Sequence, residues 1–218
     1  MKVLGLCGSH KKKSGTSEFV MKQALEGCKS KDAEVEYIRF SDYTIYPCAA
    51  CQLCFQQEPC PLFNNPKDGL KEILGKIDEA DAIVFCSPVY AYGQPAQVIN
   101  FFHRCKICHE KERSPHWGTH ITDLDSNPFS GKAVANIAVC IAAGHEGALN
   151  DIWRYANALT YTSCISLGLS MLEYDTDTHT FDIEEAEFAK KMAFEAGARL
   201  VDFWDSPLFQ TMKYLYKY

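Results

Sequence analysis

The stretch KVLGLCGSHKKKSGTS, which covers Lys2–Ser17, decides the fold class of this chain. It begins with a short apolar run, Lys2–Cys7, that ends at glycine and serine, as a buried parallel strand does where it enters a loop. A helix is predicted to begin near Thr16. Hydroxyls, glycines and backbone N–H groups at a helix start favour an anion such as a phosphate. The same hydroxyls also suit an ordinary helix N-cap, so the loop by itself allows both interpretations.

Two well-known nucleotide-binding patterns do not occur in this chain. The first loop lacks Gly-x4-Gly-Lys-Ser/Thr, the pattern of triphosphate-binding proteins, and Gly-x-Gly-x-x-Gly, the dinucleotide pattern, is found nowhere. The lysines at 11–13 suit a phosphate or an acidic partner, although a run of charges is usually a solvated surface.

Strand-like and helical segments alternate along the rest of the chain. The further predicted strands are 33–40, 82–86, 133–141 and 168–174. The predicted helices begin at Asn65-Pro66, where an N-cap residue precedes a first-turn proline, and after Pro95, and later helices lie around 153–164 and over 183–204. This alternation predicts an α/β fold with a doubly wound, five-stranded parallel sheet of order 2-1-3-4-5. We expect a single domain over residues 1–218, with a cysteine-rich loop at 43–66 and an insertion at 105–130.

Three loops of special composition meet at one edge of this sheet, because parallel strands have their carboxyl ends together. The second loop, SPVYAYGQP at Ser87–Pro95, contains Tyr90 and Tyr92, which suit the face of an aromatic ligand or simple packing at the sheet edge. The third loop, AAGHEG at Ala142–Gly147, contains two glycines. One ligand with a phosphate tail and a flat ring would use all three loops, and flavin mononucleotide (FMN) fits that description.

Four cysteines follow the second predicted strand in the stretch CAACQLCFQQEPCP. Their spacing, Cys-x2-Cys-x2-Cys-x5-Cys before a proline, is close to the ferredoxin run but has a longer last gap. Such thiolates can turn toward one centre, so we expect a 4Fe-4S cluster on Cys48, Cys51, Cys54 and Cys60. Four cysteines also suit tetrahedral zinc, and unliganded or disulfide-bonded thiols are a third interpretation.

Composition and charge narrow the class of partner. The 218 residues carry a formal net charge of −6, which opposes nucleic acid or an anionic membrane as the main partner. Met1 leads into a strand-like run without the features of a signal peptide, and the longest apolar runs are shorter than the ~20 residues of a membrane helix. We therefore expect a soluble, cytoplasmic protein whose 11 cysteines are reduced.

The predicted insertion contains two further metal-like patterns. Cys105, Cys108 and His109 match the pattern of c-type haem attachment, which is expected outside the cytosol. Cys105, Cys108, His116 and His120 form Cys-x2-Cys-x7-His-x3-His, which is shorter in the middle than a zinc finger. A second metal site and a lid or interface with incidental cysteines both stay open for this segment.

With these motifs together, the chain resembles the iron-sulfur flavoproteins, a group of NADPH-dependent FMN reductase-like proteins with a flavodoxin-like fold. The resemblance rests on the first loop, the four-cysteine run, the tyrosine loop and Gly144–Gly147. It implies that the FMN phosphate is bound by Ser9, Lys11, Ser14, Thr16 and Ser17. It implies that the isoalloxazine ring lies against Pro88, Val89, Tyr90, Tyr92 and Gly93, with Gly144 and His145 on its far side. The chain departs from the family pattern in His10, where proline is common, in one extra lysine at 11–13, and in the insertion after Arg104.

The resemblance also implies redox chemistry. A 4Fe-4S cluster passes one electron at a time and FMN accepts one or two, so the pair joins single-electron supply to two-electron reduction. We expect electrons from ferredoxin or another low-potential donor to reach a small-molecule acceptor, in a homodimer or homotetramer. No catalytic acid or base is identified, and His145 could protonate or polarise reduced flavin or simply be solvated. Two alternatives stay open: a cluster-free NAD(P)H-dependent FMN or quinone reductase, and a zinc-stabilised, non-enzymatic binding module.

Overall fold

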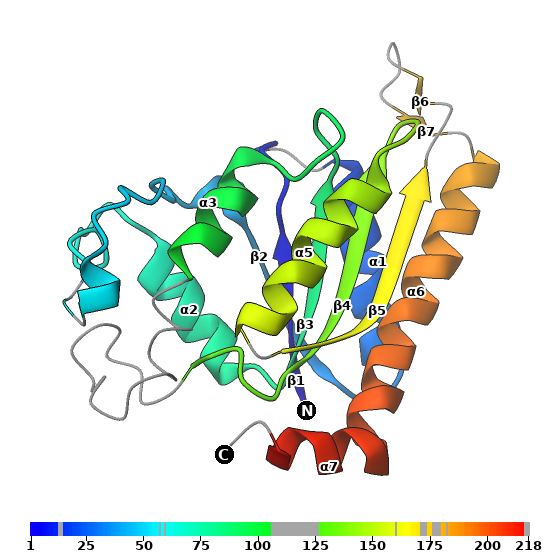
Figure 1. The fold of residues 1–218 in the computed structure, drawn as a ribbon. Helices are drawn as coiled ribbons and strands as arrows, with labels where there is room; N and C mark the ends of the chain where they lie inside the picture. The colour runs from blue at the N-terminus through cyan, green and yellow to red at the C-terminus, as the bar shows by residue number, and fades with distance from the viewer. Residues whose placement is uncertain are drawn as a thin grey trace.

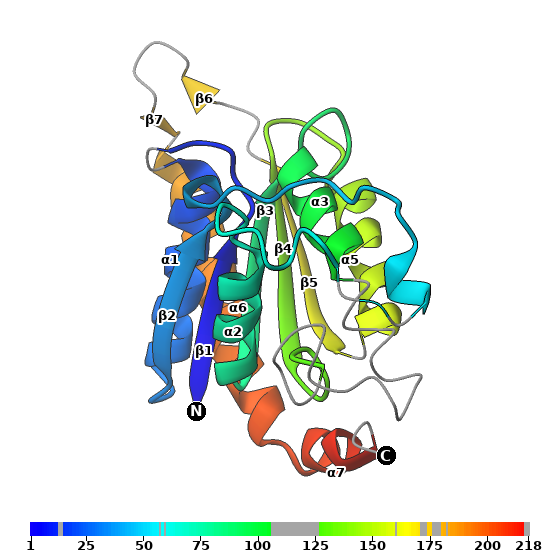
Figure 2. The ribbon, with the colours of Figure 1, turned by 90° about the vertical axis from the view of Figure 1, so that its left-hand side faces the viewer.

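The computed structural model describes residues 1–12, 15–56, 58, 60–105, 127–159, 161–170, 174–175, 180–181 and 183–215. Their main element is a five-stranded parallel sheet (Figures 1 and 2). Its strands are β1 (Lys2–Cys7), β2 (Glu34–Arg39), β3 (Ala82–Pro88), β4 (Ala133–Cys140) and β5 (Thr162–Ser170). The strand order is β2-β1-β3-β4-β5, and every neighbouring pair is parallel. The predicted doubly wound sheet of order 2-1-3-4-5 is therefore confirmed.

Helices cover both faces of the sheet (Figure 2). One face carries α1 (Thr16–Lys29) and α6 (Ile183–Asp205), and the other carries α2 (Leu70–Glu79), α3 (Ala96–Arg104) and α5 (His145–Leu159). The smaller elements are α7 (Pro207–Leu215), a two-stranded ribbon of β6 (Tyr174–Asp175) and β7 (Thr180–Phe181), and 3-10 turns at Phe40–Asp42 and Leu53–Gln56. Within the described ranges, no helix has both the length and the apolar character that crossing a membrane requires.

Each face of the sheet has its own apolar core, because successive residues of a strand point to opposite faces. In β1, Leu4 and Leu6 pack in the core with α2, α3 and α5, whereas Val3 and Cys7 pack in the core with α1 and α6. β4 is buried along its whole length, as expected for an inner parallel strand. The loops that follow β1, β3 and β4 lie together at one edge of the sheet (Figure 1).

Helices α1 and α6 approach each other at two glycines. A Cβ atom on Gly27 would lie 1.9 Å from the carbonyl oxygen of Phe194, and one on Gly197 would lie 1.8 Å from that of Ala24. The buried Cys28 thiol donates to the carbonyl of Gly197 at 3.3 Å. Backbone therefore meets backbone here, and this contact fixes α1, whose first turn forms part of the site described below.

Two predicted boundaries near the fifth strand are wrong. The strand predicted at 168–174 begins at Thr162 and ends at Ser170, and the helix predicted around 153–164 runs from His145 to Leu159. β5 is an edge strand that is only half buried along most of its length. Its polar and apolar residues are therefore mixed, which conceals the strand in the sequence.

The predicted start of the helix after the cysteine loop is also wrong. Helix α2 begins at Leu70 rather than at Asn65-Pro66. The buried carboxylate of Asp68 accepts the backbone N–H of Leu70 at 3.0 Å, and Asn65 Oδ1 accepts that of Lys67 at 3.0 Å. The asparagine thus closes a local turn, and the aspartate is the residue that satisfies the helix start.

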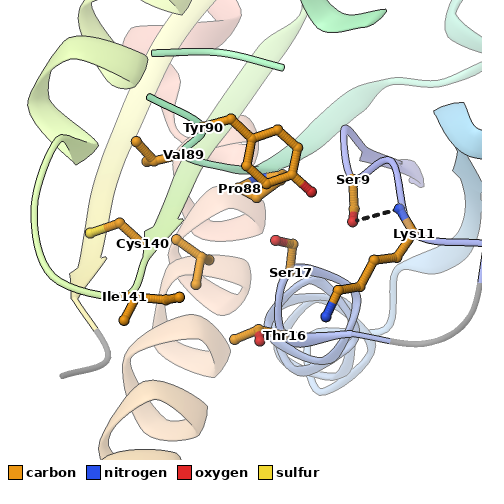
Figure 3. A pocket seen from close by; sticks show the side chains of 10 residues that line it. Ser9, Lys11, Thr16, Ser17, Pro88, Val89, Tyr90, Cys140 and Ile141 are labelled. Atoms are coloured by element: carbon orange, nitrogen blue, oxygen red, sulfur yellow. Dashed lines mark hydrogen bonds between the residues drawn. The ribbon is translucent and has the colours of Figure 1, made fainter. Parts of the chain in front are cut away.

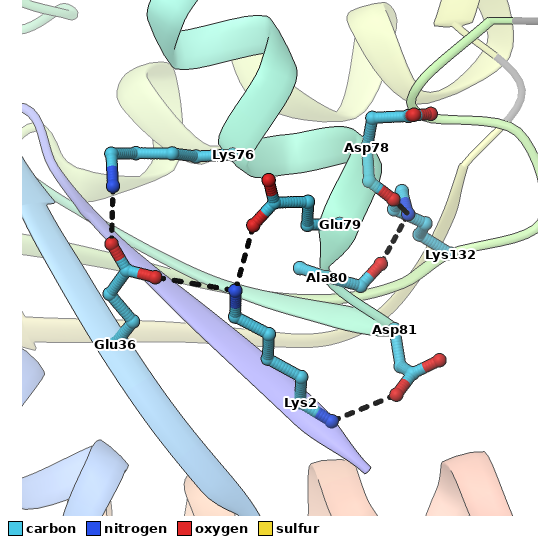
Figure 4. Close-up of polar contacts among 8 residues, drawn as sticks. All are labelled: Lys2, Glu36, Lys76, Asp78, Glu79, Ala80, Asp81 and Lys132. Atoms are coloured by element: carbon cyan, nitrogen blue, oxygen red, sulfur yellow. Dashed lines mark hydrogen bonds and ion pairs between the residues drawn. The ribbon is translucent and has the colours of Figure 1, made fainter.

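Ion pairs join β1, β2 and α2 on the outer side of the sheet (Figure 4). The Nζ atoms of Lys2 and Lys76 lie 3.4 and 2.5 Å from the carboxylate of Glu36. The hydrogen bond from Lys76 is the main cause of the lowered pKa of Glu36. Lys132 donates its ammonium group to two carbonyl oxygens at the end of α2. Exposed pairs contribute about 0–1 kcal/mol each, so these contacts refine an arrangement that the buried cores hold together.

Candidate functional site

The loops after β1, β3 and β4 enclose one pocket at the edge of the sheet (Figure 3). Its cavity volume is about 200 Å³. The lining residues are Ser9, Lys11, Thr16, Ser17, Pro88, Val89, Tyr90, Val139, Cys140 and Ile141. All but the last three are residues that the sequence indicated, and the structure brings them together from two separate loops.

The first turn of α1 forms the polar side of the pocket. Its N-cap residue is Gly15, which has no side chain to bond the first amides of the helix. Ser9 Oγ accepts the backbone N–H of Lys11 at 3.2 Å, which holds the loop in a tight bend. The Lys11 side chain extends toward the helix start, close to Thr16 and Ser17 (Figure 3). Amides, hydroxyls and one ammonium group at a helix N-terminus are suited to a phosphate.

A two-residue turn presents Tyr90 to the other side of the pocket. Tyr90 and Gly93 exchange backbone hydrogen bonds at 3.0 and 3.1 Å, and the intervening Ala91 and Tyr92 have φ of 49° and 65°. Two positive φ values are the geometry of a type I′ turn, which is strained for residues other than glycine. Tyr90 faces the pocket (Figure 3), whereas the side chain of Tyr92 is 76% exposed.

Apolar residues from β3 and β4 form the wall between these two sides. Pro88 and Val89 come from the end of β3 and the loop after it, and the N–H of Val89 donates to the carbonyl of Val139 at 2.9 Å. Val139, Cys140 and Ile141 complete the wall and were missed by the sequence reasoning. Their signal was their position at the carboxyl end of a predicted strand, whereas attention went to the glycines that follow.

The glycine loop after β4 supports the pocket from behind. Gly144 has a φ of 101°, and a Cβ atom there would lie 2.9 Å from Cα of Tyr92. His145 starts α5, and its Nδ1 lies 3.3 Å from Ser170 Oγ and 3.7 Å from the sulfur of Cys140, a lining residue. The structure therefore places four predicted residues next to the pocket rather than in its wall: Tyr92, Gly93, Gly144 and His145.

The four predicted metal-ligating cysteines line a second pocket, of about 40 Å³, beside α3. Its lining residues are Cys48, Ala49, Cys51, Gln52, Cys54, Cys60, Pro61, Leu62, His103 and Arg104. Positive φ values at Ala50 and Gln52 turn the loop back on itself between the first three cysteines. Among the side chains that the structure describes, no three Cys, His, Asp or Glu are arranged as a metal-ligand set. The four sulfurs share one pocket and are not drawn to a common centre.

A polar stripe on α3 holds the cysteine loop in place. Three side chains, spaced so that they share one helical face, each donate to a backbone carbonyl of the loop. These bonds are Gln97 to Tyr43 at 3.5 Å, Asn100 to Ile45 at 3.4 Å and Arg104 to Tyr46 at 3.2 Å. Because α3 also follows directly after the tyrosine loop, a single rigid helix links the two pockets (Figure 1).

Other cysteines differ from the loop cysteines in burial. Desolvation raises the pKa of Cys7 to about 11 and the pKa values of Cys28 and Cys164 to about 12. Burial also raises the pKa of Cys86, whose thiol donates to the carbonyl of Ser17 at 3.2 Å. These four thiols stay protonated at neutral pH and act as small packing groups, whereas a metal ligand is a thiolate.

Several predicted features lie outside the described residues. They are Ser14 of the first loop and, in the predicted insertion, Cys108, His109, His116 and His120. Cys105 is described, is fully buried and packs in the core between the sheet and α3. The haem and second-metal patterns therefore stay predictions.

Comparison with known proteins places the chain among flavin-dependent redox proteins. Residues 1–167 match the family described as NADPH-dependent FMN reductase. An iron-sulfur flavoprotein of Methanocaldococcus jannaschii is 36% identical over 98 residues, which are 45% of this chain and 48% of that protein. An iron-sulfur flavoprotein of Methanosarcina thermophila is 32% identical over 111 residues, 51% of this chain and 56% of that protein. The chain thus spans about half the length of the curated relatives it matches.

Solved structures share the fold over nearly the whole chain. A flavone reductase superposes with a TM-score of 0.68 at 18% identity, covering 94% of this chain and 65% of that one. An FMN-dependent NADH-azoreductase from Bacillus anthracis, solved in complex with FMN, superposes with a TM-score of 0.60 at 15% identity, covering 92% and 99%. Since the family match covers most of the residues that build both pockets, the chain belongs to the NADPH-dependent FMN reductase family, in the group that includes the iron-sulfur flavoproteins.

Proposed function

We propose that this protein is an FMN-dependent oxidoreductase of the iron-sulfur flavoprotein type. The observation that carries the proposal is the pocket at the carboxyl ends of β1, β3 and β4, which has a phosphate-binding side and an apolar side in one cavity. Membership of the FMN reductase family supports the same ligand. FMN supplies one- and two-electron chemistry, and the protein supplies binding, orientation and electrostatics.

The residues of the pocket have separate roles toward FMN. Thr16, Ser17 and the first amides of α1 would bind the phosphate, with Lys11 adding a positive charge. Pro88 and Val89 would cover one part of the isoalloxazine ring and exclude water from it. Ring edges left open to solvent would be the place where a substrate reaches the flavin.

We propose that the second pocket holds a 4Fe-4S cluster on Cys48, Cys51, Cys54 and Cys60. Three observations support the fit: four thiols in one small pocket, an apolar surround, and a buried guanidinium of Arg104 in its wall. The names of the curated relatives agree with this ligand set. Binding would require the four sulfurs to converge, and the positive-φ turns at Ala50 and Gln52 give the loop the tight curvature that such convergence uses.

The partners follow from the exposure of both pockets. Cys48 and Cys51 are exposed, so a low-potential protein donor such as ferredoxin can approach the cysteine pocket. The acceptor would be a small molecule at the flavin. Tyr92 and Ile141 are 76% and 64% exposed beside the flavin pocket, and a second subunit covering them would give a homodimer or homotetramer. We further propose a cytoplasmic location, with neither nucleic acid nor a membrane as partner, in keeping with the net charge of −6.

Anaerobic purification of the full chain tests this function. We expect bound FMN, broad absorbance near ~400 nm, and about four irons with matching sulfide per chain. Cys54→Ser should lose iron and keep FMN, whereas Cys164→Ser, in a strand of the sheet, should keep both.

Three other results would contradict the proposal. Protein with FMN, no iron and rapid NADPH oxidation would be a cluster-free reductase. Colourless protein with one zinc would be a zinc-stabilised binding module. Full iron content in Cys54→Ser would move the cluster away from the cysteine loop.

A further inference from the structure

Arg104, the last residue of α3, is buried in the wall of the cysteine pocket. Its side chain is 2% exposed, and its Nη1 lies 2.6 Å from Oδ2 of Asp68, which is 1% exposed. The same Nη1 donates to the carbonyl of Tyr46 at 3.2 Å. Within the part of the chain that the structure describes, Nε and Nη2 of this guanidinium are buried and have no hydrogen-bond partner.

This pattern is unusual for a buried arginine. A guanidinium has five N–H donors and cannot lose its charge in a protein. Buried donors that have left water without gaining a partner are costly, and native proteins seldom leave them so. A bidentate pair with Asp68 would have used a second nitrogen, but one carboxylate oxygen contacts Nη1 and the other accepts the backbone N–H of Leu70. The start of α2 thus holds the aspartate in a one-sided pair, which leaves two nitrogens for another acceptor.

The acceptor must be anionic and must fit beside the four cysteines. Arg104 and all four cysteines line the same pocket. Thiolates and the inorganic sulfides of an iron-sulfur cluster accept hydrogen bonds, and such bonds together with nearby charge set the reduction potential of a cluster.

We propose that Arg104 is a positioning residue that donates Nε–H or Nη2–H to a sulfur of the iron-sulfur cluster and raises its reduction potential. The inference rests on the proposed 4Fe-4S site. Reduction adds one electron to an already anionic group, so a fixed cation nearby stabilises the reduced form more than the oxidised form. Asp68 opposes this effect in part and fixes the orientation of the guanidinium.

The test compares midpoint potentials in the intact, cluster-loaded protein by redox titration followed with electron paramagnetic resonance. Removing Arg104 alone would leave a buried, unpaired carboxylate, so the charge is removed from both partners. Asp68→Asn should raise the potential of the cluster. Adding Arg104→Gln to Asp68→Asn should lower the one-electron reduction constant at least about tenfold relative to Asp68→Asn alone, a shift of about 59 mV.

Iron and sulfide content separates failure of this inference from failure of the proposed function. Wild-type protein without iron would end the proposal of a cluster. Wild-type protein with a cluster, and equal potentials in Asp68→Asn and the double variant, would show that Arg104 only anchors the loop.

A second measurement keeps the inference testable if the double variant does not fold. In wild-type protein labelled with 15N-arginine, the reduced cluster should show a hyperfine coupling to a guanidinium nitrogen. Arg104→Lys, which keeps the charge, should lose that coupling. Absence of the coupling in wild-type protein would overturn the inference.

Discussion

Replacing Gly144 with alanine should damage both the stability of the protein and its affinity for FMN. Gly144 has a φ of 101°, a conformation that L residues rarely adopt. The added methyl group would lie 2.9 Å from Cα of Tyr92 and 3.1 Å from Cγ1 of Val89, closer than carbon atoms normally approach. The backbone strain alone costs about 1–3 kcal/mol, so the free energy of unfolding of the apoprotein should fall by about that amount.

The affinity for FMN should fall because the clash is relieved by moving the pocket wall. Val89 lines the pocket, and Tyr92 belongs to the turn that carries Tyr90. FMN binding would have to restore the original wall and with it the strain. A strain of about 1.4 kcal/mol restored on binding raises the dissociation constant about tenfold.

Gly75→Ala is a matched control, measured by the same urea unfolding and flavin fluorescence titrations. Gly75 lies inside α2, and nothing would lie within 4 Å of an added Cβ atom there. Alanine should therefore stabilise the protein by about 0.5–1 kcal/mol and leave FMN affinity unchanged. Gly144→Ala with wild-type stability and wild-type affinity would refute the reasoning.

Two further predictions concern the phosphate side of the pocket and the opposite edge of the sheet. Ser17→Ala should weaken FMN about ten- to hundredfold, since a hydrogen bond to a charged group contributes about 1.5–3 kcal/mol, and should not weaken riboflavin, which lacks the phosphate. Equal losses for both flavins in fluorescence titrations would remove Ser17 from the phosphate site. Burial lowers the pKa of Lys132 from 10.5 to about 8, so between these pH values the unfolded chain binds more protons than the folded protein (Figure 4). The free energy of unfolding of wild-type protein relative to Lys132→Met should therefore rise with pH over this window, by at most about 3 kcal/mol, and a constant difference would contradict the assignment.

The sequence by itself determined the fold class and most of the flavin pocket. The apolar run at Lys2–Cys7, the helix start at Thr16 and the alternation of strands and helices are local patterns, set by which residues are buried within one element. Strand order then follows from the rules for parallel sheets, which put the loops containing Ser9 and Tyr90 at the same edge. The four cysteines were recognisable because their spacing falls within one loop.

Tertiary contacts decided what local patterns do not contain. The edge strand β5 is half exposed, so its start at Thr162 depends on pairing with β4 rather than on periodicity. Helix α2 begins where Asp68 is held, and that carboxylate is fixed by Arg104, 36 residues away. Which nitrogens of Arg104 stay unpartnered in the wall of the cysteine pocket depends on side-chain directions in three separate segments. Burial and orientation of this kind arise only when distant parts of the chain pack together, and for that reason they are not written in the order of the residues.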